Sequence, residues 1–210
     1  MLTYLRQAWL VLAVALVTGA ALAGLNSQLS PIIVANESKE RAKAAKAIVP
    51  AADKAEELTV EWTTPDKQDP AKTVGHRTVL YRVSDASGKL IAWAVPAQGK
   101  GYSSTEPIKL LVAVTPDAKR IIDYKVISSQ ETPGLGDKIV RKDFRKRFEG
   151  KSPAEPLKAA KKSGGLAPNE VQAITGATIS SQAVCSIIYD QLGKDGLIDE
   201  LAKLAGKSQH

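Results

Sequence analysis

The chain carries its most informative stretch at residues 175–192, which are TGATISSQAVCSIIYDQL. From Ile179 onward apolar residues recur three and four positions apart, which predicts an amphipathic helix over 179–192. The four residues Thr175-Gly176-Ala177-Thr178 would then lie at the helix N-terminus. Backbone N–H groups lack helical partners there, and the helix dipole is positive.

These four residues suit a bound anion. Gly176 and Ala177 are small enough for a bulky group to approach the main chain. Helix N-termini bind phosphate well, so Thr175 and Thr178 would lie beside a phosphate group. The alternative is that Thr178 only caps the helix.

Two further segments contain glycines in patterns that could contact a ligand. In Glu131-Thr132-Pro133-Gly134-Leu135-Gly136, the Pro-Gly pair favours a tight turn and the glycines allow main chain to lie flat against a ligand. The same residues also suit a plain connection between a strand and a helix. Residues 99–104 resemble a phosphate loop only superficially, because they lack the Gly-Lys-Ser/Thr ending and precede a strand.

The N-terminal part of the chain is apolar, with no charged residue from Ala8 to Leu25. As a helix rising about 1.5 Å per residue, these residues would span roughly 27 Å, close to the hydrocarbon thickness of a bilayer. We expect a short segment over 1–7 and a retained transmembrane helix over 8–25. The alternatives are a buried helix of a soluble core and a secretory signal cleaved after Ala21-Leu22-Ala23.

The charges beside this span do not fix its orientation. Lys39, Arg41 and Lys43 follow the span and only Arg6 precedes it, so the positive-inside rule favours a cytoplasmic domain. However, the export machinery also recognises such an N-terminal segment as a signal anchor. We expect a single-pass protein of the bacterial cytoplasmic (inner) membrane with its soluble domain on the extracytoplasmic side.

Composition predicts a helical connector and linker over residues 26–72. Residues 36–58 are rich in Ala, Lys and Glu and favour a helix that Pro50 interrupts. Residues 63–72 have the composition of a linker.

The next segment, residues 73–192, has the pattern of an antiparallel-sheet domain with packed helices. Strands are expected at Thr78–Val83, Leu90–Val95, Ile108–Val114 and Ile121–Ile127, a basic helix over 138–149 and a polar loop over 151–170. A C-terminal helix or tail would follow over 193–210. The expected fold class is α+β.

The amino-acid composition excludes several kinds of functional site. Cys185 is the only cysteine, which excludes an internal disulfide, and with only His76 and His210 it excludes a Cys/His zinc cluster. Aromatic residues make up 5% of the chain, too few for a surface that stacks nucleic-acid bases. No acid, base and nucleophile form a recognisable set, so we expect no catalytic residue and no metal site.

The net charge of +7 includes a local basic run. Its members are Lys138, Arg141, Lys142, Arg145, Lys146 and Arg147. The run could be a solvated helix face, or a docking patch for anionic lipid headgroups or an acidic partner protein. We expect no nucleic acid as a partner, because the domain is attached to a membrane.

The order and spacing of these motifs resemble one family. Residues 99–192 look like the FMN-binding domain of the G subunit of Rnf-type ion-translocating oxidoreductases and of its sister, the C subunit of sodium-pumping NADH:quinone reductase. The matching elements are Gly101-Tyr102-Ser103, Pro107-Ile108-Lys109, Glu131 to Gly136, Phe148-Glu149-Gly150-Lys151-Ser152 and Ile174 to Ser181. Asp137-Lys138-Ile139 resembles the Rnf branch in particular.

The resemblance implies a covalent flavin. In this family FMN is joined through a phosphoester bond to the threonine that matches Thr178, and a separate flavin transferase makes the bond from FAD. Thr175, Gly176 and Ala177 would form the phosphate turn. The residues expected to flank the flavin ring are Glu131, Thr132, Gly134, Leu135 and Gly136, with Tyr102 as a further contact.

The resemblance also implies a function and contains one departure. The chain would be an electron-carrying subunit of a membrane redox pump that moves electrons between ferredoxin and NAD, together with other membrane and peripheral subunits. The family usually has an acidic residue six positions before the modified threonine, whereas this chain has Gln172. The alternative is therefore a non-redox, membrane-anchored assembly or binding subunit whose flavin site has lapsed.

Overall fold

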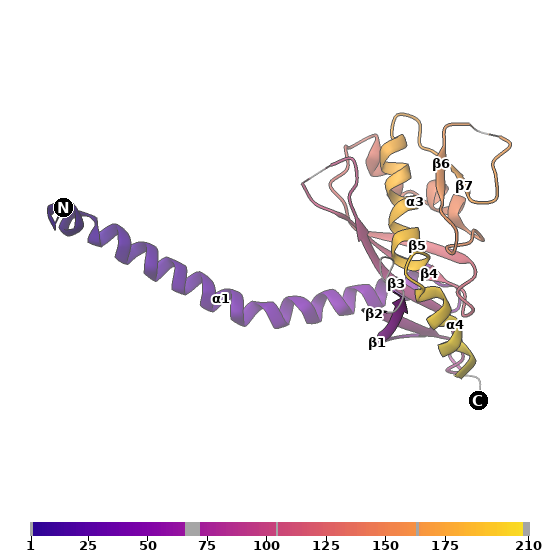
Figure 1. Ribbon diagram of the computed structural model, residues 1–210, viewed down its shortest axis with the longest axis horizontal. Coiled ribbons are helices and arrows are strands. Elements are labelled where there is room, and N and C mark those ends of the chain that lie inside the picture. The colour runs from indigo at the N-terminus through magenta and orange to yellow at the C-terminus, as the bar shows by residue number, and fades with distance from the viewer. Residues whose placement is uncertain (1, 66–71, 104, 163, 208–210) are drawn as a thin grey trace. The chain divides into compact units, whose positions relative to one another are not determined.

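The computed structural model describes residues 2–65, 72–103, 105–162 and 164–207. The chain forms two compact units, Met1–Glu40 and Arg41–His210. Helix α1 (Leu2–Ile48) provides the described part of the first unit and ends inside the second (Figure 1).

The first unit is an exposed apolar helix. One 18-residue window of the segment Ala8–Ile48 has a mean hydropathy of 2.2, and none of that window is buried in protein. Large side chains from Trp9 to Val34 are more than half exposed at many positions, which is unfavourable in water over so long a stretch. The helix includes the predicted span over 8–25 and is long and apolar enough to cross a membrane.

The second unit is built on a five-stranded antiparallel sheet with the strand order β1-β2-β3-β4-β5. The strands are β1 (Lys54–Pro65), β2 (Thr73–Ser84), β3 (Leu90–Gly99), β4 (Ile108–Val114) and β5 (Ile121–Ser128). The four strands expected from alternation are present as β2 to β5, so the α+β prediction is confirmed.

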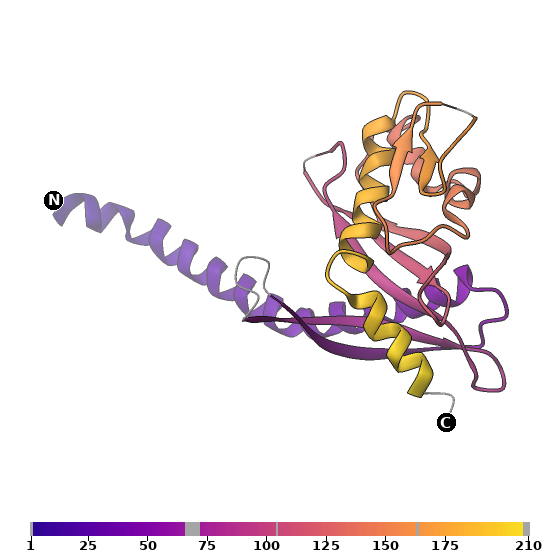
Figure 2. The ribbon, with the colours of Figure 1, turned by 45° about the vertical axis from the view of Figure 1, so that its right-hand side comes forward.

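Both faces of the sheet are covered by helices. On one face Tyr81 and Leu111 pack against Ala45 and Ile48, which belong to the last turns of α1. On the other face Trp93 and its neighbours pack against α3 (Thr178–Leu192) and α4 (Leu197–Lys207) (Figure 2). Packing of α3 against one face of the sheet fixes its place across the strands and so fixes the position of its N-terminus.

The sequence expectation was wrong for strand β1. Residues 54–58 were expected to be helical and residues 63–72 to be a linker, but Lys54–Pro65 pair with β2 along their whole length. Pairing in the sheet outweighs the helix propensity of Lys-Ala-Glu-Glu. Residues 66–71 lie outside the described residues.

The basic helix expected over 138–149 is divided into three short pieces. These are η1 (Gly136–Val140), α2 (Lys142–Arg145) and η2 (Lys146–Phe148), and the backbone is extended at Arg141 between the first two. Ile139, Phe144 and Phe148 are all buried, and a spacing of five followed by four does not fit one face of a regular helix. The break at Arg141 lets all three reach the core.

The polar loop expected over 151–170 contains one short strand. Strand β6 (Lys158–Ala160) pairs in parallel with β7 (Glu170–Gln172). The chain continues from β7 into the turn that precedes α3.

Candidate functional site

A cavity of about 680 Å³ lies beside the N-terminus of α3. Its lining residues are Tyr102, Thr132, Leu135, Gly136, Lys161, Ala173, Ile174, Thr175, Gly176, Ala177, Thr178, Ile179 and Ser180. All the site residues predicted from the sequence line it except Glu131 and Gly134. The fold therefore brings together the two segments that the sequence singled out, and the volume is within the range of small-molecule sites.

The turn before α3 is held by neighbouring residues. The Ala177 N–H donates to the Ile174 carbonyl (2.9 Å). The buried Ser181 hydroxyl accepts from the Ile174 N–H (3.0 Å) and donates to the Ala177 carbonyl (2.8 Å). Gly176 has φ of +80°, in the left-handed region that glycine adopts without strain. Residues 174–181 thus supply the bonds that shape their own turn.

Thr178 is the first residue of α3, and Ala177 occupies the N-cap without a side-chain capping bond. The Thr178 side chain is half-buried and lines the cavity. Its hydroxyl has no hydrogen-bond partner among the described residues, so the alternative in which Thr178 caps the helix is wrong. The hydroxyl is available beside the unpaired N–H groups of the first helical turn.

Glu131 lies behind the cavity wall. The residue is 6% exposed, and its carboxylate accepts hydrogen bonds from the Ser103 N–H (3.1 Å) and from the Ser180 hydroxyl. One buried carboxylate thus joins the loop that carries Tyr102 to the first turn of α3. A β-carbon at Gly136 would lie 2.6 Å from this carboxylate, which explains the glycine at that position.

Three large apolar side chains make much of the cavity lining. Leu135, Ile179 and Tyr102 are 43%, 59% and 63% exposed. A β-carbon at Gly176 would lie 3.2 Å from the Leu135 side chain, so the two glycine-rich segments are in close contact. Exposed apolar surface beside a free hydroxyl and a helix N-terminus suits a ligand with a flat ring and a phosphate.

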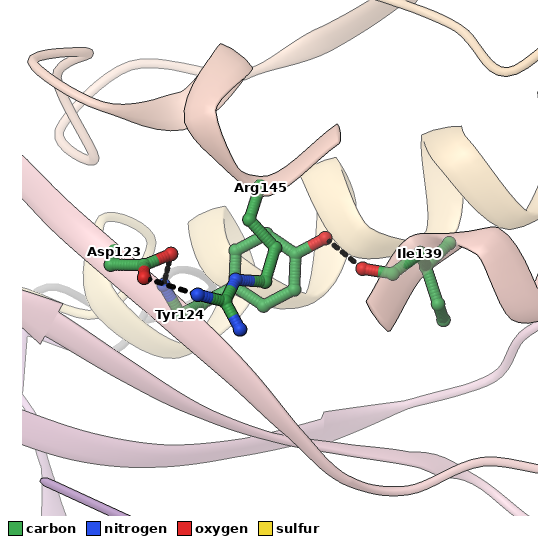
Figure 3. Close-up of polar contacts among 4 residues, drawn as sticks. All are labelled: Asp123, Tyr124, Ile139 and Arg145. Atoms are coloured by element: carbon green, nitrogen blue, oxygen red, sulfur yellow. Dashed lines mark hydrogen bonds and ion pairs between the residues drawn. The ribbon is translucent and has the colours of Figure 1, made fainter. Parts of the chain in front are cut away.

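A polar network on β5 holds the segment after Gly136 in place (Figure 3). The Tyr124 hydroxyl donates to the Ile139 carbonyl (2.8 Å) in η1. Arg145 pairs with Asp123 (2.7 Å), and the Asp123 carboxylate also accepts from the Tyr124 N–H (2.7 Å). Burial raises the pKa of Tyr124 well above its ordinary value, so the phenol stays protonated and remains a donor.

Lys161 is a cavity residue that the sequence did not single out. It follows β6, and the Ala173 N–H donates to the Ala160 carbonyl (2.7 Å), so the end of β6 lies beside the turn. Three-residue strands leave no periodic signal in a sequence, so only the fold shows that Lys161 belongs to the site.

The basic run does not form one uniform face. Arg145 is bound to Asp123, and Arg147 donates to the Gln172 carbonyl (2.8 Å). Arg141 and Lys142 are exposed. The departure from the family pattern at Gln172 lies at the end of β7, and the residue does not line the cavity.

His76 and Cys185 lie outside the cavity lining. His76 stacks on Trp62 at 5.1 Å and shares a hydrogen bond with the Thr64 hydroxyl (2.7 Å), while His210 is outside the described residues. Burial raises the pKa of the Cys185 thiol to about 12, which leaves it unreactive at neutral pH. Within residues 2–65, 72–103, 105–162 and 164–207, no three His, Cys, Asp or Glu side chains cluster as a metal site would require.

Comparison with known proteins agrees with this geometry. Residues 101–192 match the FMN-binding domain family. The chain is 43% identical over 104 residues to the G subunit of the proton-translocating ferredoxin:NAD(+) oxidoreductase complex of Clostridium ljungdahlii, covering 50% of this chain and 53% of that one. The match thus spans only about half the length of that relative.

A longer match extends beyond this domain. The chain is 31% identical over 154 residues to the G subunit of the ion-translocating oxidoreductase complex of Methanosarcina acetivorans, covering 73% of both chains. The crystal structure of NqrC from Shewanella oneidensis has a TM-score of 0.55 and 27% identity, covering 67% of this chain and 69% of that one. The chain therefore belongs to the family of G subunits of ion-translocating oxidoreductase complexes, Rnf-type proteins with an FMN-binding domain.

Proposed function

We propose that this protein is an electron-carrying flavoprotein subunit of a membrane-bound, redox-driven ion pump. The observation that carries the proposal is the free Thr178 hydroxyl at the α3 N-terminus, inside a cavity of the FMN-binding domain. Electrons would pass through FMN between ferredoxin and NAD, the reaction named for the Clostridium relative. Other membrane and peripheral subunits would complete the complex.

The lining residues fit FMN. Gly176 and Ala177 leave the main chain of the turn open to a phosphate, and a larger residue at position 176 would press on Leu135. Leu135, Tyr102 and Ile179 offer apolar surface for a flat ring. Bound FMN would supply transfer of electrons singly or in pairs, and this chain would hold it and exclude water.

The proposed attachment is a phosphoester at Thr178. Its hydroxyl oxygen would bond to the FMN phosphorus of FAD as the pyrophosphate bond breaks, AMP leaves and the hydroxyl proton is released. A separate flavin transferase would catalyse the exchange. The remaining phosphodiester charge would lie at the positive end of α3, where helix termini stabilise anions.

The attachment is tested by mass and fluorescence after denaturation. Full-length protein coexpressed with its flavin transferase should keep flavin fluorescence in a denaturing gel and gain the mass of FMN less water. Thr178→Ala should abolish both signals, Thr178→Ser should retain labelling, and Thr175→Ala should leave at least partial labelling. Flavin that washes out of the wild-type protein, or that remains in Thr178→Ala, would contradict the covalent attachment.

The rival function is a membrane-anchored assembly subunit without redox activity, and Gln172 is the residue that favours it. A colourless wild-type protein, coexpressed with an active transferase and showing no added mass, would support this rival.

The apolar helix and the family support a membrane-anchored arrangement. We propose that α1 is a retained anchor and that the sheet domain lies on the extracytoplasmic side. Alkaline phosphatase fused after His210 should be active, because that enzyme works only when exported. An inactive fusion would reverse the orientation, and a mature N-terminus at Gly24 would show that the span is cleaved.

A further inference from the structure

Lys161 is a cation that faces the cavity without an ion-pair partner among the described residues. It lines the cavity together with Thr175 and Thr178. Its neighbour Lys162 pairs with Glu170 instead, with 2.8 Å between the ammonium nitrogen and a carboxylate oxygen. Two adjacent lysines thus differ in their contacts, and one of them lines the cavity that contains the proposed phosphate site.

The position of Lys161 is set by the backbone. Strands β6 and β7 run in parallel with Ala160 opposite Gln172, and the Ala173 N–H donates to the Ala160 carbonyl (2.7 Å). The residue after Ala160 therefore lies beside the segment that leads into the turn before Thr178.

The charges around the cavity favour an anion at this end. Lys161 is the charged side chain among the lining residues, and no carboxylate is among them. The nearby Glu131 carboxylate lies behind the wall and is bound by Ser103 and Ser180. A phosphate at the α3 N-terminus would meet the helix dipole and the Lys161 ammonium group together.

We propose that Lys161 binds the phosphate of FMN and so sets the preference of the cavity for a phosphorylated flavin. The proposal rests on the proposed function in one respect, that the ligand is FMN, and it does not require the covalent bond. Lysine acts here as a flexible point charge, which suits a phosphate held mainly by backbone N–H groups.

The test compares FMN with riboflavin, which has the same ring and lacks the phosphate. Full-length protein made without flavin transferase is titrated with each ligand in detergent by fluorescence quenching. Wild-type protein should bind FMN more tightly than riboflavin. Lys161→Met should reduce that preference about two- to fivefold, the effect of one exposed ion pair, and high salt should remove the difference between the variant and wild type.

The matched controls are Lys161→Arg, which keeps the charge, and Lys162→Met, which removes the neighbouring charge. Both should keep most of the preference for FMN. An equal loss in Lys162→Met, an equal weakening of FMN and riboflavin in Lys161→Met, or no preference in the wild type would overturn the proposal. Because Lys161 is exposed, the variant should fold normally.

A second measurement covers the case in which free flavin binds too weakly to titrate. Flavinylated and unmodified protein are melted side by side, and the gain in Tm on flavinylation should be smaller in Lys161→Met than in Lys162→Met. Equal gains would overturn the role of Lys161. If Thr178 proved not to carry FMN, the covalent attachment would fail while the FMN-to-riboflavin ratio still tested Lys161.

Discussion

The turn before α3 and the loop after β5 both line the cavity, and they are held by different kinds of contact. In the turn, Ser181 bonds to Ala177 and Ile174, which are four and seven residues away in the sequence. In the loop, Glu131 bonds to Ser103 and Ser180, which are 28 and 49 residues away. The turn is thus shaped by its own segment, whereas the loop depends on the assembled fold.

The two sides should therefore differ in stability and in their effect on flavin binding. A local turn can form as soon as α3 forms, because closing a short loop costs little entropy. The long-range side requires that the segments around Ser103, Glu131 and Ser180 meet first. Loss of the Glu131 hydrogen bonds should therefore open the cavity more than loss of the Ser181 hydrogen bonds in the turn.

Glu131→Ala should produce the largest effect. It leaves the Ser103 N–H and the buried Ser180 hydroxyl without their acceptor, and each such loss costs about 1–3 kcal/mol, so we expect about 3 kcal/mol of lost stability. Covalent flavin should fall with it. Urea unfolding of the full-length protein in detergent measures the free energy, and intact mass measures the flavin.

Two further variants test whether the lost stability is due to the buried carboxylate of Glu131. Glu131→Gln keeps a carbonyl acceptor and should cost less than half as much. Glu149→Ala removes an exposed carboxylate and should change stability by less than about 0.5 kcal/mol. Hydrogen exchange should accelerate at the Ser103 N–H in Glu131→Ala and remain slow at the Ile174 and Ala177 N–H groups; the reverse pattern would contradict the comparison.

The same contrast explains which parts could be predicted from sequence. The α3 stripe and the Thr175–Thr178 turn are encoded by residues next to one another, and both were predicted. Alternation also located strands β2 to β5. Strand β1 was missed because Lys54–Glu57 favour a helix when isolated, and only the partner strand β2 overrides this preference.

Features that depend on distant contacts leave little signal in the sequence. The bonds of the Glu131 carboxylate to Ser103 and Ser180 follow from the assembled fold, and its place beside the flavin ring stays a prediction. Lys161 was missed because β6 is too short to leave a pattern and lies in a segment expected to be a loop. The break at Arg141 follows from core packing of Ile139 and Phe144, which no local preference encodes.

Ser181→Ala should produce the intermediate effect, on the local side. It leaves the Ile174 N–H, on a residue only 8% exposed, without its acceptor, so we expect a loss of about 1–2 kcal/mol. Exchange should accelerate at the Ile174 and Ala177 N–H groups and not at the Ser103 N–H. Ser186→Ala is the control on the same helix, because Ser186 is half-buried and, among the described residues, its hydroxyl is hydrogen-bonded only to the Gln182 amide (3.2 Å). If Ser186→Ala lowered the free energy of unfolding as much as Ser181→Ala, the loss would not come from the hydrogen bonds between Ser181 and the turn.

The smallest change in stability should come from raising the pH from 8 to 9, and it should arise from Cys185 on α3. Cys185 is fully buried on α3, and burial raises the pKa of its thiol to about 12. An unfolded thiol titrates near 8.5, so the unfolded state releases its proton first as the pH rises and the folded state loses relative stability. From pH 8 to pH 9 this should cost the wild type about 0.7 kcal/mol more than Cys185→Ala, measured by urea unfolding with reductant present.

The interval from pH 8 to pH 9 separates Cys185 on α3 from Tyr124 on β5. Burial raises the pKa of Tyr124 above its ordinary value near 10, so the phenol stays protonated at pH 9 in the folded protein and largely protonated in the unfolded protein. Tyr124→Phe should therefore lower stability by the same amount at pH 8 and pH 9, since it removes the bond to the Ile139 carbonyl without removing a group that titrates in this range. If wild type and Cys185→Ala lost stability in parallel between these pH values, the thiol would be exposed or mobile in the folded state. The packing of α3 that positions Thr178 would then be looser than the structure shows.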